Sequence, residues 1–281
     1  MREITVEQIK EQVVPLCLTA AYDLQQDVRQ AIARAAQLES SSLGRSMLNQ
    51  LVENYSLAAK ERAPICQDTG VAVFFVDVGQ DVRISGGALQ EALAEATSEA
   101  WKQGYLRMSV VEDPLFTRKN TGVNGPPIVH LSLVPGDRLK ITIAPKGGGS
   151  ENMSRMAMLK PTAGLTAVAD FIYETVLSAG GNPCPPIIVG VGVGGNFEVA
   201  PILAKRALLR PLGQPHPDAN YAEFEKMMLD RVNASGVGPQ GLGGSTTAMA
   251  VHVEHYPCHI ASLPVAVNLN CHAARHASVE I

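Results

Sequence analysis

The densest run of chemically versatile residues in this 281-residue chain is CQDTG at positions 66–70. It places a thiol, an amide and a carboxylate side by side, directly before a strand-like run. Two further cysteines, Cys184 in GNPCPP and Cys271 in NLNCHAARH, also lie in turn-like sequence. Three thiolates in turns suit an iron–sulfur cluster that leaves one iron open as a Lewis acid. The long separations between the three do not by themselves bring them together.

The remaining two cysteines are Cys17 and Cys258. Cys17 stands inside a helical pattern, where a small buried hydrophobe is the expected role. The total of five cysteines is odd, and no CxxC pair occurs. Neither a disulfide framework nor a zinc ribbon is therefore indicated.

A local zinc site is an alternative for the C-terminal segment, which holds most of the histidines: His252, His255, His259, His272 and His276. With Cys258 and Cys271 they offer the imidazole and thiolate ligands that zinc prefers. Their spacing matches no typical zinc-binding pattern, so zinc stays the less favoured interpretation.

Two features could bind an anion. GGG at 147–149 follows a strand-like segment, and consecutive glycines expose N–H groups as an anion-binding nest requires. A flexible surface loop is the plainer interpretation of the same run. Arg107, in GYLRMS, could clamp a carboxylate with two hydrogen bonds or could be a solvated surface charge.

The run GVGVGG at 190–195 fits the pattern GxGxxG through Gly190, Gly192 and Gly195. A dinucleotide site would also require an acidic residue about 20 positions further on, where the sequence is basic instead. We therefore favour a strand that packs closely against its neighbours, with glycines that permit the approach of backbone.

Helices and strands alternate around these motifs. Apolar residues at helical spacing and flanking turn residues predict helices over 24–35, 44–62, 87–104, 165–179, 197–209 and 218–234, and the first 63 residues are helical in character. Strands are predicted over 71–78, 187–193, 246–255 and 262–269, with a hairpin-like pair of strands around Pro135-Gly136-Asp137.

Composition places the chain among globular proteins. Hydrophobic residues make up 46% and charged residues 18%, which excludes an intrinsically disordered chain, and the net charge of −4 provides no basic surface for nucleic acid. The polar start and the absence of long apolar runs predict a cytoplasmic protein with no membrane span. We expect an α/β fold with a mixed β-sheet flanked by helices, in a single domain over 1–281 that begins with a helical subregion at 1–63.

Five runs follow one another in order from about residue 40 to the C-terminus: PxCQDTG, APKGGGSENMS, NPCPP with GVGVGGN, GPQGLGG, and PVAVNLNCHAARH. Together they resemble class I fumarate hydratases and the related L-tartrate dehydratases, and GSENMS looks more similar to the former. The resemblance implies a hydro-lyase with a 4Fe-4S cluster that interconverts fumarate and (S)-malate. Dehydration of L-tartrate is the alternative.

The resemblance also implies roles for single residues. Cys66, Cys184 and Cys271 would bind three irons of the cluster, and the fourth iron would bind substrate. Gln67 would bind substrate, as would Arg107 and the backbone of Gly148. Asp68 and His259 would be the catalytic groups that handle the proton.

A partner subunit is expected as well. Single-chain members of the family carry a second, C-terminal domain with further substrate-binding residues, whereas this chain ends ten residues after Cys271. The chain thus resembles the α subunit of two-subunit members, which implies a β subunit, a hetero-oligomer and a small dicarboxylate substrate. A noncatalytic metal- or cluster-binding subunit and a nucleotide-binding oxidoreductase built on GVGVGG are the competing hypotheses.

Overall fold

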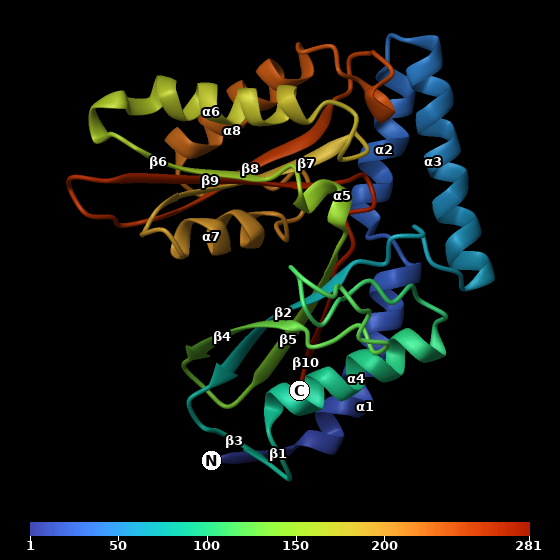
Figure 1. Ribbon diagram of the computed structural model, residues 1–281. Coiled ribbons are helices and arrows are strands. Elements are labelled where there is room, and N and C mark those ends of the chain that lie inside the picture. The colour runs from blue at the N-terminus through green and yellow to red at the C-terminus, as the bar shows by residue number, and fades with distance from the viewer. The chain divides into compact units, whose positions relative to one another are not determined.

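The computed structural model describes residues 1–281 and divides into two compact units (Figure 1). Unit 1 comprises Met1–Leu24, Tyr55–Gly148 and Arg275–Ile281, and unit 2 comprises Gln25–Asn54 and Gly149–Ala274. The single domain over 1–281 that we expect from the sequence stays a prediction. The division leaves no mark in the sequence because each unit is built from separate segments and one boundary falls inside helix α3 (Ser42–Glu61), where no linker composition appears.

The main sheet of unit 1 has the strand order β10-β5-β2-β4. Its strands are β2 (Val71–Gly79), β4 (Ile128–Val134), β5 (Leu139–Lys146) and β10 (Ala277–Glu280). β2 pairs parallel with β4 and antiparallel with β5, so the sheet is mixed, as predicted. The predicted hairpin is wrong, because β2 lies between β4 and β5 and the two strands around Pro135-Gly136-Asp137 do not pair.

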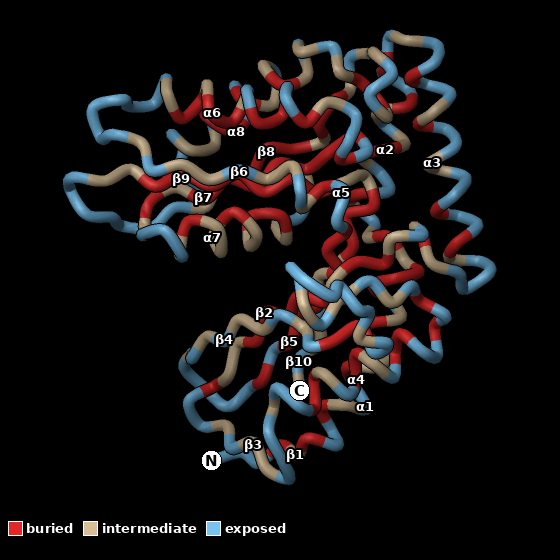
Figure 2. The backbone as a smooth tube through the Cα atoms, in the orientation of Figure 1, coloured by how far each residue is buried: buried red, intermediate tan, exposed pale blue.

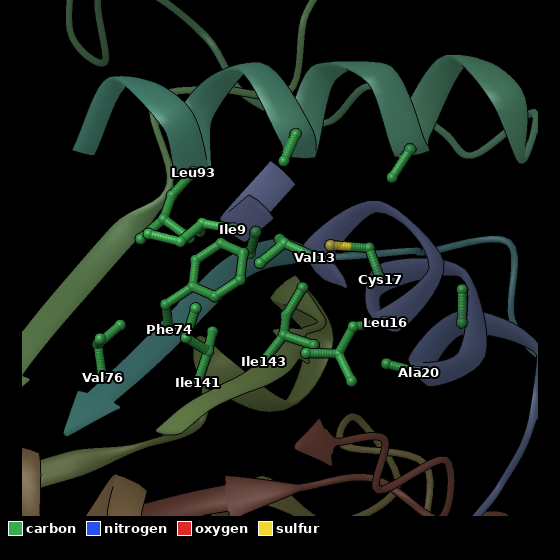
Figure 3. Packing of buried hydrophobic residues seen from close by; sticks show 14 of the residues in the cluster. Ile9, Val13, Leu16, Cys17, Ala20, Phe74, Val76, Leu93, Ile141 and Ile143 are labelled. Carbon is green, nitrogen blue, oxygen red and sulfur yellow. The ribbon is translucent and has the colours of Figure 1, made fainter. Parts of the chain in front are cut away.

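Two helices, α1 (Val6–Tyr22) and α4 (Leu89–Gln103), cover one face of this sheet (Figure 3). Ile9, Val13 and Cys17 recur at helical spacing on α1 and are buried against strand residues such as Phe74 and Ile141. The predicted role of Cys17 as a buried hydrophobe is confirmed, and burial raises the pKa of its thiol. A short parallel pair, β1 (Arg2–Thr5) and β3 (Val82–Ser85), completes the unit.

Unit 2 holds a second mixed sheet with the order β6-β9-β7-β8. Its strands are β6 (Arg155–Leu159), β7 (Ile187–Gly194), β8 (Ala248–Tyr256) and β9 (Leu263–Asn270). β7 runs parallel to β8 and antiparallel to β9. The centre of this sheet is buried along most of its length (Figure 2). Because β7 and β9 are antiparallel, the start of β7 and the end of β9 lie at the same end of the sheet.

Helices cover both faces of the unit 2 sheet. α6 (Gly164–Ala179) and α8 (Ala219–Asn233) pack on one face, and α7 (Val199–Ala207) packs on the other. The remaining helical segments are α2 (Gln26–Leu38), α5 (Gly148–Glu151), and single 3-10 turns at Pro161–Ala163 and Pro239–Gly241. The α/β class and the helical N-terminal region are as predicted. No helix has both the length and the apolar character needed to cross a bilayer.

Candidate functional site

In unit 1 the CQDTG run forms a turn just before β2, and the carboxylate of Asp68 organises it. Asp68 Oδ1 accepts a hydrogen bond from Gly70 N at 3.0 Å, and Oδ2 accepts one from Gly148 N at 2.7 Å. The structure thus brings together two residues that are 80 positions apart and that the sequence analysis assigned to one site. The N–H of Gly148, expected to bind substrate, donates to the Asp68 carboxylate here.

Arg107 is tied to the same turn through its main chain. The hydroxyl of Thr69 donates to Arg107 O at 2.9 Å, and the side chain of Asn124 donates to Gly70 O at 3.1 Å. The side chains of Arg107 and Gln67 are exposed, and Cys66 is half-buried. Four of the predicted site residues, Gln67, Asp68, Arg107 and Gly148, therefore belong to one corner of unit 1.

Two buried cations in this corner were not singled out from the sequence. Lys146 is 6% exposed, and its Nζ lies 3.5 Å from Gly147 O. Arg275 is 2% exposed and donates from Nη2 to Asp68 O at 2.8 Å, whereas its Nε and Nη1 are buried without a hydrogen-bond partner. Buried positive charge favours a nearby anion. Lys146 lies in APKGGGSENMS and Arg275 in NLNCHAARH. Their place in these motifs was the only indication in the sequence that they belong near the site.

In unit 2 Cys184 and Cys271 lie at one end of the sheet. Cys184 comes just before β7, Cys271 directly follows β9, and His272 N donates to Cys184 O at 3.3 Å. Cys184 has a φ of +55°, in the left-handed region that residues with a side chain rarely adopt. Such strained positions cluster at functional sites. The long sequence separation between these two cysteines is thus closed by the antiparallel pairing of β7 and β9.

His259 lies elsewhere in unit 2. It belongs to the exposed loop between β8 and β9, where its Nδ1 accepts a hydrogen bond from Ala261 N at 3.1 Å. The full length of β9 separates this loop from Cys271, which is about 25 Å at the usual rise per strand residue. The structure therefore does not bring His259 to the end of the sheet that carries the two cysteines.

The glycine-rich run in β7 serves packing. A Cβ on Gly190 would lie 2.1 Å from Ala204 O, and a Cβ on Gly192 would lie 2.0 Å from Ala200 O, so α7 approaches the strand backbone to backbone. This confirms the interpretation favoured from the sequence.

Among the C-terminal histidines, His252 is buried against Ala207 O, and burial lowers its pKa to about 4.

The cysteines fit a thiolate-bound group in their chemistry and setting. Cys184 and Cys271 lie in loops held to one another by a backbone hydrogen bond, and thiolates are the ligands of iron–sulfur clusters. Cys66 belongs to unit 1. No group of three or more His, Cys, Asp or Glu side chains lies together in a way that would hold a metal ion, so the structure itself displays no complete ligand set.

Comparison with known families decides the class of protein. Residues 10–280 match the family described as fumarate hydratase (fumerase). The chain belongs to the fumarate hydratase family. It is therefore a member of a hydro-lyase family, and the match covers both units of the structure.

Relatives within the fumarate hydratase family carry a more specific name. A protein of Methanocaldococcus jannaschii, provisionally named L(+)-tartrate dehydratase subunit alpha, is 41% identical over 274 residues, covering 96% of either chain. Proteins of Escherichia coli strain K12 and Shigella sonnei, both named L(+)-tartrate dehydratase subunit alpha, are 34% identical over 281 residues, covering 99% of this chain and 92% of theirs. These names favour the tartrate alternative over the fumarate reaction that the GSENMS run suggested.

Proposed function

We propose that this chain is the α subunit of an L(+)-tartrate dehydratase and acts together with a β subunit. The observation that carries the proposal is the end-to-end similarity to proteins named as that subunit, at 41% identity for the archaeal relative. The positively charged side chains of Arg107 and Arg275 near Asp68 support the proposal, because tartrate carries two carboxylates.

The reaction defines what the site has to do. Dehydration of tartrate removes hydroxide from one carbon and a proton from the neighbouring carbon, and it releases water and the enol form of oxaloacetate. The enzyme must hold two carboxylates, accept the proton and assist the departure of the hydroxyl group.

We assign proton transfer to Asp68. Each oxygen of its carboxylate accepts one backbone N–H, from Gly70 or Gly148, which fixes the direction of the group and leaves further lone pairs for a proton. His259 receives no step in a site formed by one chain, because its loop lies at the opposite end of β9 from Cys271.

The positive groups near Asp68 suit the binding of the carboxylates. Arg107 is exposed and able to form a bidentate pair with a carboxylate, and Gln67 offers an amide beside it. Buried Arg275 adds a positive charge behind the Asp68 main chain. These groups would bind and orient the dianion before the proton moves.

Cys66, Cys184 and Cys271 would hold a 4Fe-4S cluster. Such a cluster supplies an electrophilic iron that polarises the hydroxyl group and weakens its bond to carbon. These three thiols are the ones that lie in the family-like motifs of the sequence, and each follows or precedes a strand.

Substrate competition tests the proposal. The chain is co-expressed with its β subunit, purified without oxygen, and assayed with L(+)-tartrate, D(−)-tartrate, (S)-malate and fumarate. The proposal predicts the highest kcat/KM for L(+)-tartrate with formation of oxaloacetate, and no turnover by the α chain alone. A higher kcat/KM for fumarate or (S)-malate would restore the fumarate hydratase reaction. Cluster content without turnover of any substrate would favour a noncatalytic subunit.

A further inference from the structure

The loop GPQGLGGSTT at 238–247 has no part in the proposed chemistry, yet it packs on the turn that carries Cys184. The backbone N and the side-chain Nε2 of Gln240 both donate to Pro185 O, at 2.8 and 2.7 Å. Gln240 itself has a φ of +54°, in the left-handed region. One strained residue thus directs two hydrogen bonds at the carbonyl directly after Cys184.

The contact between the two loops is also a close approach of backbones. A Cβ on Gly241, whose φ is +74°, would lie 2.5 Å from the Cα of Gly181. Gly181 O in turn accepts a hydrogen bond from Cys184 N at 3.0 Å. The Cys184 turn is therefore held on its N-terminal side by Gly181 and on its C-terminal side by Gln240.

The loop has its own anchor in Glu39, a carboxylate that is 1% exposed. Glu39 accepts hydrogen bonds from the backbone N–H groups of Ser245 and Thr246, both at 2.8 Å, and of Ser41 at 2.9 Å. A Cβ on Gly244 would lie 2.6 Å from Glu39 Oε1, so the loop backbone closes directly over the carboxylate. Glu39 thus ties residues 245–246 to the segment that joins α2 to α3.

We propose that Gln240 is a positioning residue for Cys184 and that Glu39 anchors the loop that presents it. The inference rests on the proposed function in taking Cys184 as a cluster ligand. Ligands need support of this kind, because small displacements weaken metal binding and the groups behind a ligand are often as important as the ligand itself.

Hydrogen exchange on the metal-free chain tests the positioning role without any cluster. Gln240→Ala removes one of the two hydrogen bonds, so exchange of residues 181–187 rises about fivefold, while exchange of β9 stays unchanged. Gln240→Gly gives the same local rise, because glycine tolerates the left-handed backbone but also lacks the amide. Glu39→Gln weakens the attachment of the loop to Glu39 and therefore also raises hydrogen exchange of residues 238–247. Gln103→Ala, on the surface of α4, is the control and changes neither segment.

A second readout uses the loaded protein. Loss of iron from Gln240→Ala to a chelator is about tenfold faster than from wild type, a size typical of changes behind a metal ligand. Unchanged exchange at 181–187, a rise spread over the whole unit, or a rise in Gln240→Ala that Gln240→Gly abolishes would each overturn the inference. If wild type takes up no cluster, the proposed function fails while the exchange measurement still decides the role of Gln240.

Discussion

The two ends of the unit 2 sheet differ in how firmly they are built. At the end where β7 begins and β9 ends, Cys184 bonds to the backbones of Gly181 and His272, and Gln240 holds the next residue, Pro185. At the other end, the loop between β8 and β9 is exposed, with Ile260 91% accessible. Both ends carry cysteine and histidine, so residue types alone do not distinguish them. The hydrogen bonds that hold the turn around Cys184 distinguish this end of the sheet from the other.

The contrast shows where chemistry should be sensitive to substitution. The proposed function makes Cys184 a metal ligand, which needs fixed geometry, and a buried carboxylate, several left-handed residues and close backbone contacts lie at this end of the sheet. The exposed loop has hydrogen bonds of its own, such as the one from Gly195 N to Pro257 O, but no buried carboxylate anchors it. Substitutions at the first end should change metal binding and turnover, and those at the second end should not.

The largest effect is expected for Cys184→Ser. Under the proposed function, loss of this thiolate should remove the cluster and lower kcat by at least about 1,000-fold, since its electrophilic iron would supply several kcal/mol of barrier reduction. The matched control is Cys258→Ser in the exposed loop, which should retain iron and activity. Equal iron loss in the two variants would abolish the distinction between the ends.

A second prediction separates turnover from metal binding in unit 1. Asp68→Asn removes the proposed proton acceptor and keeps one carbonyl oxygen, which can accept from only one of the two N–H groups, of Gly70 or of Gly148. Turnover should fall about 10²- to 10⁴-fold, the usual contribution of a general base, while iron content stays at the wild-type level. Parallel loss of iron and activity would give Asp68 a structural role instead.

A third prediction concerns stability rather than chemistry. Glu225 pairs with Arg210 at 2.6 Å, both side chains are at most 10% exposed, and Glu225 also accepts from Val253 N. Glu225→Ala leaves the buried guanidinium of Arg210 with only the longer ion pair to Glu254, at 3.6 Å, and should lower the free energy of unfolding by about 3 kcal/mol in denaturant titrations. Iron per folded chain should not change. Asp170→Ala, which breaks the exposed pair with Arg231, is the control at about 0–1 kcal/mol.

The free energy of unfolding below about pH 4.5 should depend on the protonation of Glu39. Burial opposes the charge of Glu39, but hydrogen bonds from Ser41, Ser245 and Thr246 outweigh it and lower the pKa from 4.5 to about 2. The folded state therefore binds this proton less readily than the unfolded chain. Its contribution of about 3 kcal/mol is fully present above pH 4.5 and is lost as the pH falls toward 2. Glu39→Gln should flatten this pH dependence in urea titrations; an unchanged slope would contradict the lowered pKa.

The sequence predicts most helices of this chain because their signals are local. Leu24, Val28 and Ile32 recur at helical spacing and are buried in the structure, and the helices over 87–104 and 218–234 are present within a few residues. The glycines at 190 and 192 were predicted to permit a close approach, and the structure supplies its partner, α7.

Strand order could not be predicted in the same way. A turn such as Pro135-Gly136-Asp137 normally joins paired strands, but here β2, from far earlier in the chain, occupies the place between them. The two compact units also leave no signal in the sequence, since each is assembled from distant segments. Nothing local to a strand records which partner it will find.

The candidate site was predicted in part. Asp68 and Gly148, both predicted site residues, form a hydrogen bond, and Cys184 and Cys271 share an end of one sheet. Arg275 was not predicted as a site residue because arginine side chains are usually solvated. Only the fold shows that this side chain is buried and bonded to Asp68 O. His259 lay close to Cys271 in sequence, but an intervening strand carries the two residues apart.

The iron and acid-labile sulfide content of the chain tests the central claim most directly. Wild type, Cys184→Ser and Cys258→Ser are each purified without oxygen in complex with the β subunit. The account predicts about four irons and four sulfides per α chain in wild type and Cys258→Ser, as a 4Fe-4S cluster requires, and loss of both in Cys184→Ser. Zinc in place of iron, or iron that survives in Cys184→Ser, would contradict a cluster held by the three cysteines.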